Sequence, residues 1–110
     1  MKIVDLLQEI VATYRKHGWE LRCALLREAS KAEVAELQPP IGVSIKDAEV
    51  DALWFSRPSH GNREAWELRL LAQTQYALFE TFEADESEEE RADVKQEMEA
   101  RLRDYVSNGR

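Results

Sequence analysis

The first hydrophobic pattern in the chain has the period of an α-helix. Apolar residues recur at steps of three and four and would share one helix face: Ile3, Val4, Leu7, Ile10, Val11 and Tyr14. Arg15 and Lys16 supply cationic side chains for the end of this helix, and Gly18 can adopt the positive φ that commonly follows one. The pattern therefore predicts a helix that ends just before Gly18.

The period changes directly after Gly18. From Trp19 to Leu25, apolar and polar residues alternate, as they do on a strand with one buried face. The alternation predicts that one face of this strand carries four residues: Trp19, Leu21, Cys23 and Leu25.

Three further strands are predicted later in the chain. They cover residues 49–57, 66–70 and 76–82, and the turn-rich residues 58–62 form a hairpin loop between the first two. Residues 41–46 are ambiguous between a loop and a short edge strand.

Two capping-box patterns predict where the other helices begin. Ser30-Lys31-Ala32-Glu33 opens a short helix that Pro39 must end. Ser87-Glu88-Glu89-Glu90 opens a long helix that continues to Val106. This second helix carries a narrow apolar stripe: Val94, Met98, Leu102 and Tyr105.

The order of elements predicts an α+β fold. We expect a two-layer sandwich, in which an antiparallel sheet of about four strands carries both long helices on the same face. The predicted order is helix, strand, short helix, three strands and helix. The length fits a single domain over residues 1–106, with residues 107–110 as a frayed tail.

The charge is concentrated in one segment. The chain has 22 acidic and 15 basic residues, a net charge of -7, and residues 83–99 hold nine acids with only Arg91 and Lys95 as bases. Nine minus two accounts for the whole excess of seven. This segment is interpreted as a solvated helix start, stabilised by the helix dipole, or else as a docking patch for a basic partner or a mimic of nucleic-acid charge. We favour the helix start, and we expect binding to neither nucleic acid nor a membrane, because such a field repels anionic surfaces.

The sequence contains no motif specific for catalysis. Its four glycines are isolated, and one cysteine with two histidines does not make a structural zinc site. We therefore expect no cofactor, no metal and no enzymatic activity. The chain shows neither a membrane-spanning run nor a signal-peptide pattern, which predicts a soluble, cytoplasmic protein.

The hairpin loop carries the densest group of polar side chains. Arg57, His60 and Arg63 flank or occupy this turn, and arginine side chains recognise carboxylates or phosphates through paired hydrogen bonds. One interpretation of these residues is an anion or partner site at the loop. The interpretation that we favour is a polar hairpin tip whose residues serve only the turn itself.

Three further residues are candidates for contact with a ligand or partner. Trp54 and Phe55 are adjacent, so a strand must send them to opposite faces, and one of them needs a cover. That cover is a helix, a partner or a ligand. Glu80 shares its phase with Leu78 and Phe82 and would line a pocket if it faced inward, although we favour its exposure to water.

Together these features predict a non-enzymatic interaction or adaptor module. We expect its partner to be another protein or a second copy of the chain. One alternative is a small-molecule-binding domain, with a pocket between sheet and helices lined by Trp54, Trp66, Tyr76 and Phe79. A less favoured alternative is an enzyme built on His60.

Overall fold

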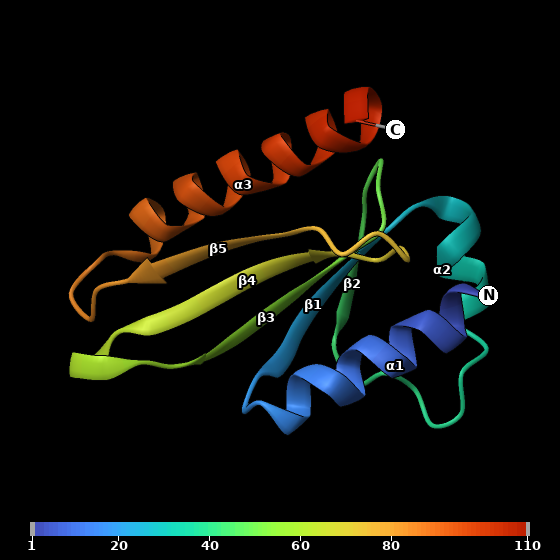
Figure 1. Ribbon diagram of the computed structural model, residues 1–110, viewed down its shortest axis with the longest axis horizontal. Helices are drawn as coiled ribbons and strands as arrows, with labels where there is room; N and C mark the ends of the chain where they lie inside the picture. Colours follow the sequence, from blue (N-terminus) through green and yellow to red (C-terminus); the bar gives the residue numbers. More distant parts are fainter. Residues whose placement is uncertain (1, 110) are drawn as a thin grey trace.

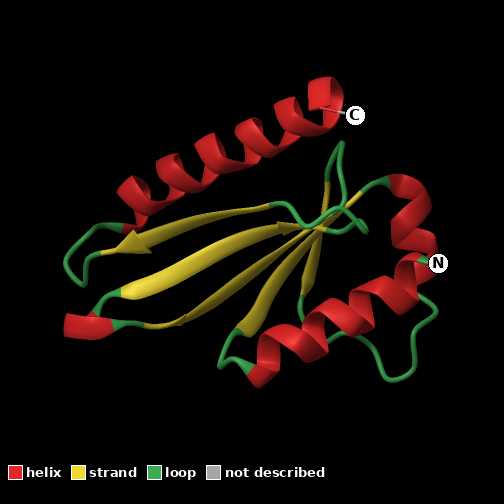
Figure 2. Cartoon of the chain, in the orientation of Figure 1, coloured by secondary structure: helices red, strands yellow, loops and turns green. Residues whose placement is uncertain are grey.

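The computed structural model describes residues 2–109 and has five strands in one sheet, with helices on both of its faces (Figures 1 and 2). The α+β class is thereby confirmed. The elements in chain order are α1 (Ile3–Lys16), β1 (Glu20–Leu26), α2 (Glu28–Val34), β2 (Ser44–Asp47), β3 (Ala52–Pro58), a 3₁₀ turn η1 (His60–Asn62), β4 (Glu64–Leu70), β5 (Ala77–Phe82) and α3 (Glu88–Gly109).

The sheet is mixed, with the strand order β2-β1-β3-β4-β5. β1 and β2 are parallel, and the other neighbouring pairs are antiparallel. The prediction of an antiparallel sheet of about four strands was wrong in this respect. The ambiguous stretch at residues 41–46 contributes β2, and the helical connection through α2 brings β2 back parallel to β1.

The two long helices lie on opposite faces of the sheet, so the prediction of a two-layer sandwich was also wrong. α1 and α2 cover one face and α3 covers the other (Figure 1). The central strand β3 requires both layers because its successive residues are buried on alternate sides. Leu53 and Phe55 face α1, whereas Ala52 and Trp54 face α3.

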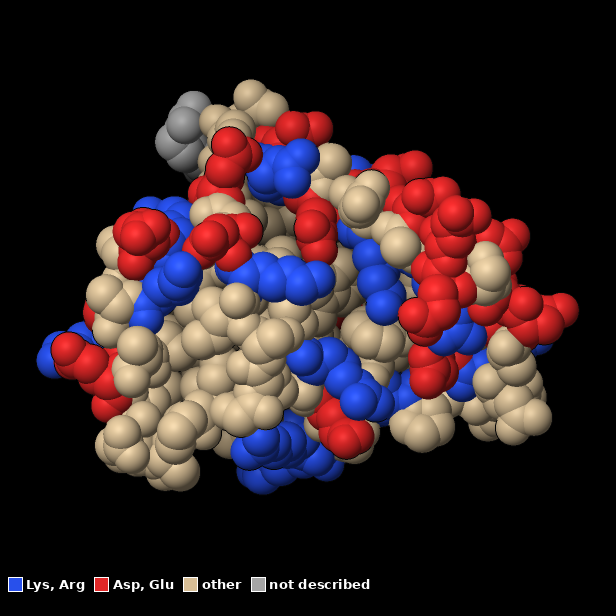
Figure 3. Space-filling view, turned by 180° about the vertical axis from the view of Figure 1, so that it is seen from behind, with Lys and Arg blue, Asp and Glu red and all other residues tan. Residues whose placement is uncertain are grey.

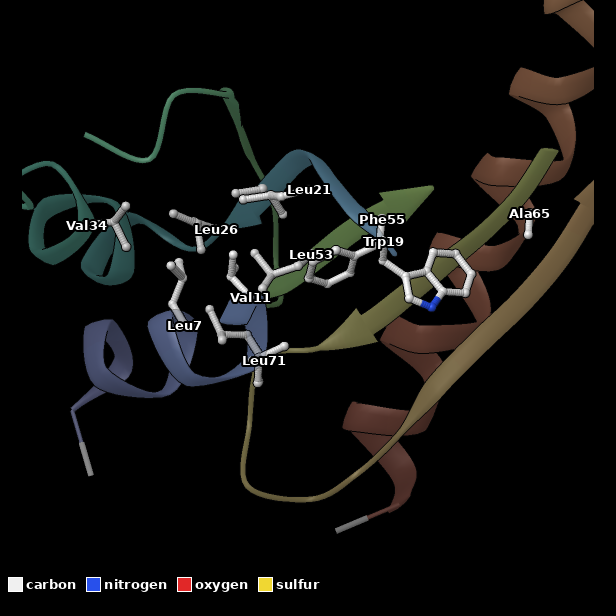
Figure 4. Close-up of a cluster of buried hydrophobic side chains, with 12 residues drawn as sticks. Leu7, Val11, Trp19, Leu21, Leu26, Val34, Leu53, Phe55, Ala65 and Leu71 are labelled. Carbon is white, nitrogen blue, oxygen red and sulfur yellow. The ribbon is translucent and has the colours of Figure 1, made fainter. Parts of the chain in front are cut away.

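Each face of the sheet has its own hydrophobic core. The α1-side core, shown in Figure 4, packs Leu7 and Val11 of α1 against Leu53 and Phe55. The α3-side core places Met98 and Leu102 of α3 with Trp54, Leu68 and other residues of the sheet.

A β-bulge at Arg22 changes which face the residues of β1 occupy. Leu21 lies opposite Phe55, and Cys23 lies opposite Trp54, with Arg22 as the extra residue between them. Leu21 therefore joins the α1-side core, while Cys23 packs against the α3-side core. The predicted single row of Trp19, Leu21, Cys23 and Leu25 is divided between the two faces.

The predicted capping box at Ser87 is present. The Ser87 Oγ accepts a hydrogen bond of 3.1 Å from the Glu90 backbone N–H, and a Glu90 carboxylate oxygen accepts one of 2.9 Å from the Ser87 backbone N–H. α3 continues to Gly109, past its predicted end at Val106 and through most of the predicted tail. The other capping box was wrong, because α2 begins at Glu28 and Ser30 is buried inside it.

No helix within residues 2–109 is long and apolar enough to cross a membrane.

Candidate functional site

An open groove of about 970 Å³ lies beside α3, on the α3 side of the sheet. It exists because α3 packs against β4 and β5 and leaves the same face of β1 and β2 uncovered. Successive turns of α3 border it, from Glu88 through Lys95 to Arg103, and β2 contributes Ser44 and Lys46. We refer to this feature as the α3 groove.

Two tryptophans form the aromatic part of the groove. The ring centroids of Trp54 and Trp66 are 6.0 Å apart in an edge-to-face arrangement with an interplanar angle of 73°. Trp54 Nε1 donates a hydrogen bond of 2.9 Å to Glu99, and Trp66 Nε1 donates one of 3.1 Å to Glu64. Both indole N–H groups are therefore satisfied, and the rings are held in fixed positions.

The α3 wall presents two basic side chains to the sheet. Lys95 Nζ lies 3.4 Å from the centroid of a Trp66 ring, a cation–π contact. Arg91 donates a hydrogen bond of 2.7 Å to the Glu64 carboxylate and another of 2.7 Å to the Glu83 carbonyl. Arg91 and Lys95 are the two bases of the acidic segment 83–99, and both are partly buried.

Charged side chains of both signs lie on the face seen in Figure 3. Lys and Arg side chains run across the middle of the molecule among Asp and Glu side chains, which are densest on the side where α3 begins. The position of Arg91 and Lys95 explains how a helix with an acidic exterior still presents cations to the sheet.

The surroundings of the groove shift the pKa values of two of its groups. Burial lowers the pKa of Lys95, and the nearby Arg91 charge lowers it further. The hydrogen bond from Trp66 lowers the pKa of Glu64, and Arg91 acts in the same direction. Glu64 is thus a carboxylate already engaged by the protein, whereas Lys95 is a cation held partly out of water.

Trp54 and Phe55, adjacent candidates in the sequence, have different surroundings. Trp54 borders the α3 groove with a side chain that is almost fully buried. Phe55 is fully buried on the other face, where the ring of Tyr14 stacks on it at a centroid distance of 4.0 Å. The cover that Phe55 needed is therefore α1 of the same chain.

The candidates at the hairpin loop do not converge on one point. Arg57 donates a hydrogen bond of 2.7 Å to the His17 carbonyl, and its guanidinium lies 4.6 Å from the centroid of a Trp19 ring. Arg63 pairs with Glu83 at 3.1 Å, and His60 is exposed in η1. A site at this loop stays a prediction, but both guanidiniums already have partners within the chain.

Glu80 lies opposite Trp66 in the register of β4 and β5, which places it on the α3 side of the sheet. It is exposed, as the sequence interpretation favoured. Its carboxylate accepts a hydrogen bond of 3.3 Å from the Thr81 backbone N–H and is absent from the groove lining.

Only part of the pocket lining that the sequence predicted lies together in the structure. Trp54 and Trp66 meet in the groove, but Tyr76 stacks on Tyr105 at 3.7 Å, and Phe79 is 58% exposed beside Trp19 on the opposite face. Arg22, Lys46 and Lys95 border the groove but were not among the candidates predicted from the sequence. One signal was available, since the only two bases of the acidic segment are spaced four residues apart, on one helix face.

Within residues 2–109, no group of three His, Cys, Asp or Glu side chains is placed to hold a metal ion. Comparison of the chain with protein-family models, with curated proteins and with solved structures finds no match. The groove itself combines aromatic surface with cationic side chains, a combination suited to binding groups that carry both apolar surface and negative charge.

Proposed function

We propose that the protein is a non-enzymatic interaction module and that the α3 groove binds an extended segment of a partner protein. The observation that carries this proposal is the length of the groove. Its α3 border runs from Glu88 to Arg103, which corresponds to about 22 Å along a helix axis. An extended chain of roughly seven residues covers the same distance.

The borders of the groove support an extended occupant. β2 is an edge strand, with β1 as its partner in the sheet. Ser44 and Lys46 of β2 lie opposite Cys23 and Leu25, so these side chains share the face that α3 leaves open. A helix on one side and a strand edge on the other form an elongated channel, a shape typical of peptide-binding sites.

Cys23 provides a direct test, because it is the single cysteine of the chain, is partly exposed and lies in the groove lining. A library of random octapeptides would be selected on the protein by phage display. N-ethylmaleimide, which alkylates a thiol, would then be used to place a bulky group in the groove. We expect the selected peptides to bind the alkylated protein at least tenfold more weakly.

The matched control is Cys23→Ser, which has no thiol to alkylate. N-ethylmaleimide-treated Cys23→Ser protein should retain the binding of the untreated variant, and circular dichroism should show the same fold in every sample. The proposal is wrong if no peptide is enriched, or if the enriched peptides bind equally well after alkylation of the wild-type protein.

A small aromatic carboxylate is the second candidate occupant, favoured by the Trp54–Trp66 pair and the nearby Lys95. In that case benzoate or an indole carboxylate would raise the melting temperature at ligand concentrations where no peptide binds. A second copy of the chain would also be a protein partner, and light scattering would then report a dimer.

A further inference from the structure

Three basic side chains from three elements line the α3 groove. They are Arg22 of the β1 bulge, Lys46 of β2 and Lys95 of α3, and we call them the cationic cluster. The positive charge of Lys46 is close enough to act on Lys95, and that of Arg22 acts on the neighbouring Glu64. Lys95 is thus within electrostatic range of Lys46, and both Arg22 and Lys95 are within range of Glu64.

These cations have few close partners in the protein, although the Glu64 and Glu88 carboxylates act electrostatically on Lys95. Neither Lys46 nor Lys95 belongs to any of the ion pairs formed among residues 2–109. Arg22 donates a hydrogen bond of 2.7 Å to Ser56, and its remaining contact with Glu20 is long, at 3.9 Å.

Most carboxylates of the groove lining have other partners. Glu64 binds Trp66 and Arg91, and Glu99 binds Trp54. Asp47 pairs with Lys31 at 2.6 Å, and Glu49 pairs with Arg103 at 3.6 Å. Of the lining carboxylates, this leaves the exposed Glu88 as the one without an ion-pair or hydrogen-bond partner among the described side chains. Glu88 and Glu99 keep their negative charge, since the Trp54 indole is a neutral donor. Arg22, Lys46 and Lys95 remain without a close ion-pair partner among the described residues, in a protein whose net charge is -7.

We propose that the partner segment is acidic and that one of its Asp or Glu carboxylates binds between Lys46, Lys95 and Arg22. The aliphatic part of that side chain and its neighbours would lie on the Trp66 ring, which Lys95 already contacts. A partly desolvated ammonium without a counterion gains more from an incoming carboxylate than a fully hydrated one does. This inference rests on the proposed peptide-binding function and names the chemistry of the peptide.

The acidic exterior of α3, which lies beside the groove, repels anions. The arrangement therefore selects an acidic segment of limited length over a long polyanion such as nucleic acid.

The test uses three octapeptides of alternating sequence, Glu-Val, Gln-Val and Lys-Val, each with blocked termini and a fluorescent label. Fluorescence polarisation would measure their dissociation constants. We expect the Glu-Val peptide to bind at least tenfold more tightly than the Gln-Val peptide, and the Lys-Val peptide to bind most weakly. Raising the salt concentration should weaken the Glu-Val complex selectively.

Variants that each remove one positive charge show which side chains cause the preference for the Glu-Val peptide. Lys95→Met and Lys46→Met should each reduce the preference for Glu-Val over Gln-Val by about fivefold to tenfold and leave Gln-Val binding unchanged. Lys16→Met is the matched control, because Lys16 is exposed on α1, across the sheet from the groove. It removes the same charge and should leave the preference intact, and circular dichroism should show that all three variants are folded.

Equal binding of the Glu-Val and Gln-Val peptides, or no Glu-Val binding at millimolar concentration, overturns the inference. An equal loss of preference in Lys16→Met also overturns it, because the effect would then come from net charge. A different outcome is that random peptides are enriched in the first experiment even so, and that alkylation of Cys23 weakens their binding. In that case the proposed function stands, and only the acidic specificity is wrong. If that selection fails as well, both proposals are wrong.

Discussion

Asp51 shows how one side chain joins separate parts of the chain. Its carboxylate is 6% exposed and accepts hydrogen bonds from the Arg27 backbone N–H at 2.8 Å, the Arg27 guanidinium at 2.9 and 3.1 Å, and the Ser30 hydroxyl at 2.7 Å. Its own backbone carbonyl accepts a hydrogen bond from the Leu71 backbone N–H at 2.9 Å. The residue thus links the start of α2 to the segment that leads into β3.

Replacing Asp51 by Ala should lower the free energy of unfolding by about 2–3 kcal/mol, because the buried Ser30 hydroxyl and the Arg27 backbone N–H lose a charged acceptor. The measurement is urea denaturation followed by circular dichroism. Asp47→Ala is the matched control, since Asp47 also forms an ion pair with a basic residue of this region but its side chain is 80% exposed. That change should cost less than about 1 kcal/mol. Equal losses in the two variants would contradict the role assigned to Asp51.

At the scale of a single element, α3 shows how an acidic helix packs against a sheet. Its first turn contains Glu88, Glu89 and Glu90, which interact favourably with the helix dipole, and Ser87 and Glu90 satisfy N–H groups at its start. Few apolar residues face the sheet, so Lys95 and Arg91 complete the contact surface by stacking on Trp66 and Phe82. The aromatic rings of the sheet thus contact charged side chains of α3 as well as its apolar ones.

Ser87→Ala should remove one half of the reciprocal cap and destabilise the protein by about 1 kcal/mol. Chemical denaturation of the variant and the wild type gives this difference. Ser59→Ala is a suitable control, because Ser59 is exposed and makes no side-chain capping hydrogen bond at η1. A Ser87→Ala protein as stable as Ser59→Ala would show that the cap contributes nothing measurable.

At the scale of the whole molecule, β3 is shared by two cores. The buried residues of this strand alternate between the α1 side and the α3 side, so neither helical layer packs on a sheet of its own. Loss of one layer exposes one complete face of β3 to water, at a cost of about 25 cal/mol for each Å² of apolar surface. The two layers should therefore unfold together.

The Trp19→Phe protein tests this cooperativity, because its remaining tryptophans, Trp54 and Trp66, both lie on the α3 side. In that background, Leu7→Ala would remove a buried side chain of the α1-side core, with an expected loss of roughly 3 kcal/mol. Tryptophan fluorescence and far-UV circular dichroism should report the same lowered denaturation midpoint. A fluorescence midpoint that stays unchanged while the circular dichroism midpoint falls would show that the layers unfold separately.

Most of the elements were predictable from sequence because their signals are local. The apolar stripe of Leu7 and Val11 identified α1, and the Ser87 capping box located the start of α3. The candidate site was much less predictable. Lys46 and Lys95 are 49 positions apart in the chain, and no local pattern indicates that their charges approach each other.

The periodicity of apolar residues was sufficient to predict the α+β class and the two long helices, because each depends on neighbours only a few positions away. The same pattern placed apolar residues on both faces of β3 but left open what covers them. Other features depend on which faces of the helices and of the sheet pack together. These are the mixed sheet, the placement of α1 and α3 on opposite faces, and the groove. A bulge at Arg22 moves Cys23 from the face of Leu21 to the other face without any change in the alternation of the sequence. The cationic cluster exists only because packing distributes the helices over two faces and leaves part of one face open between α3 and β2.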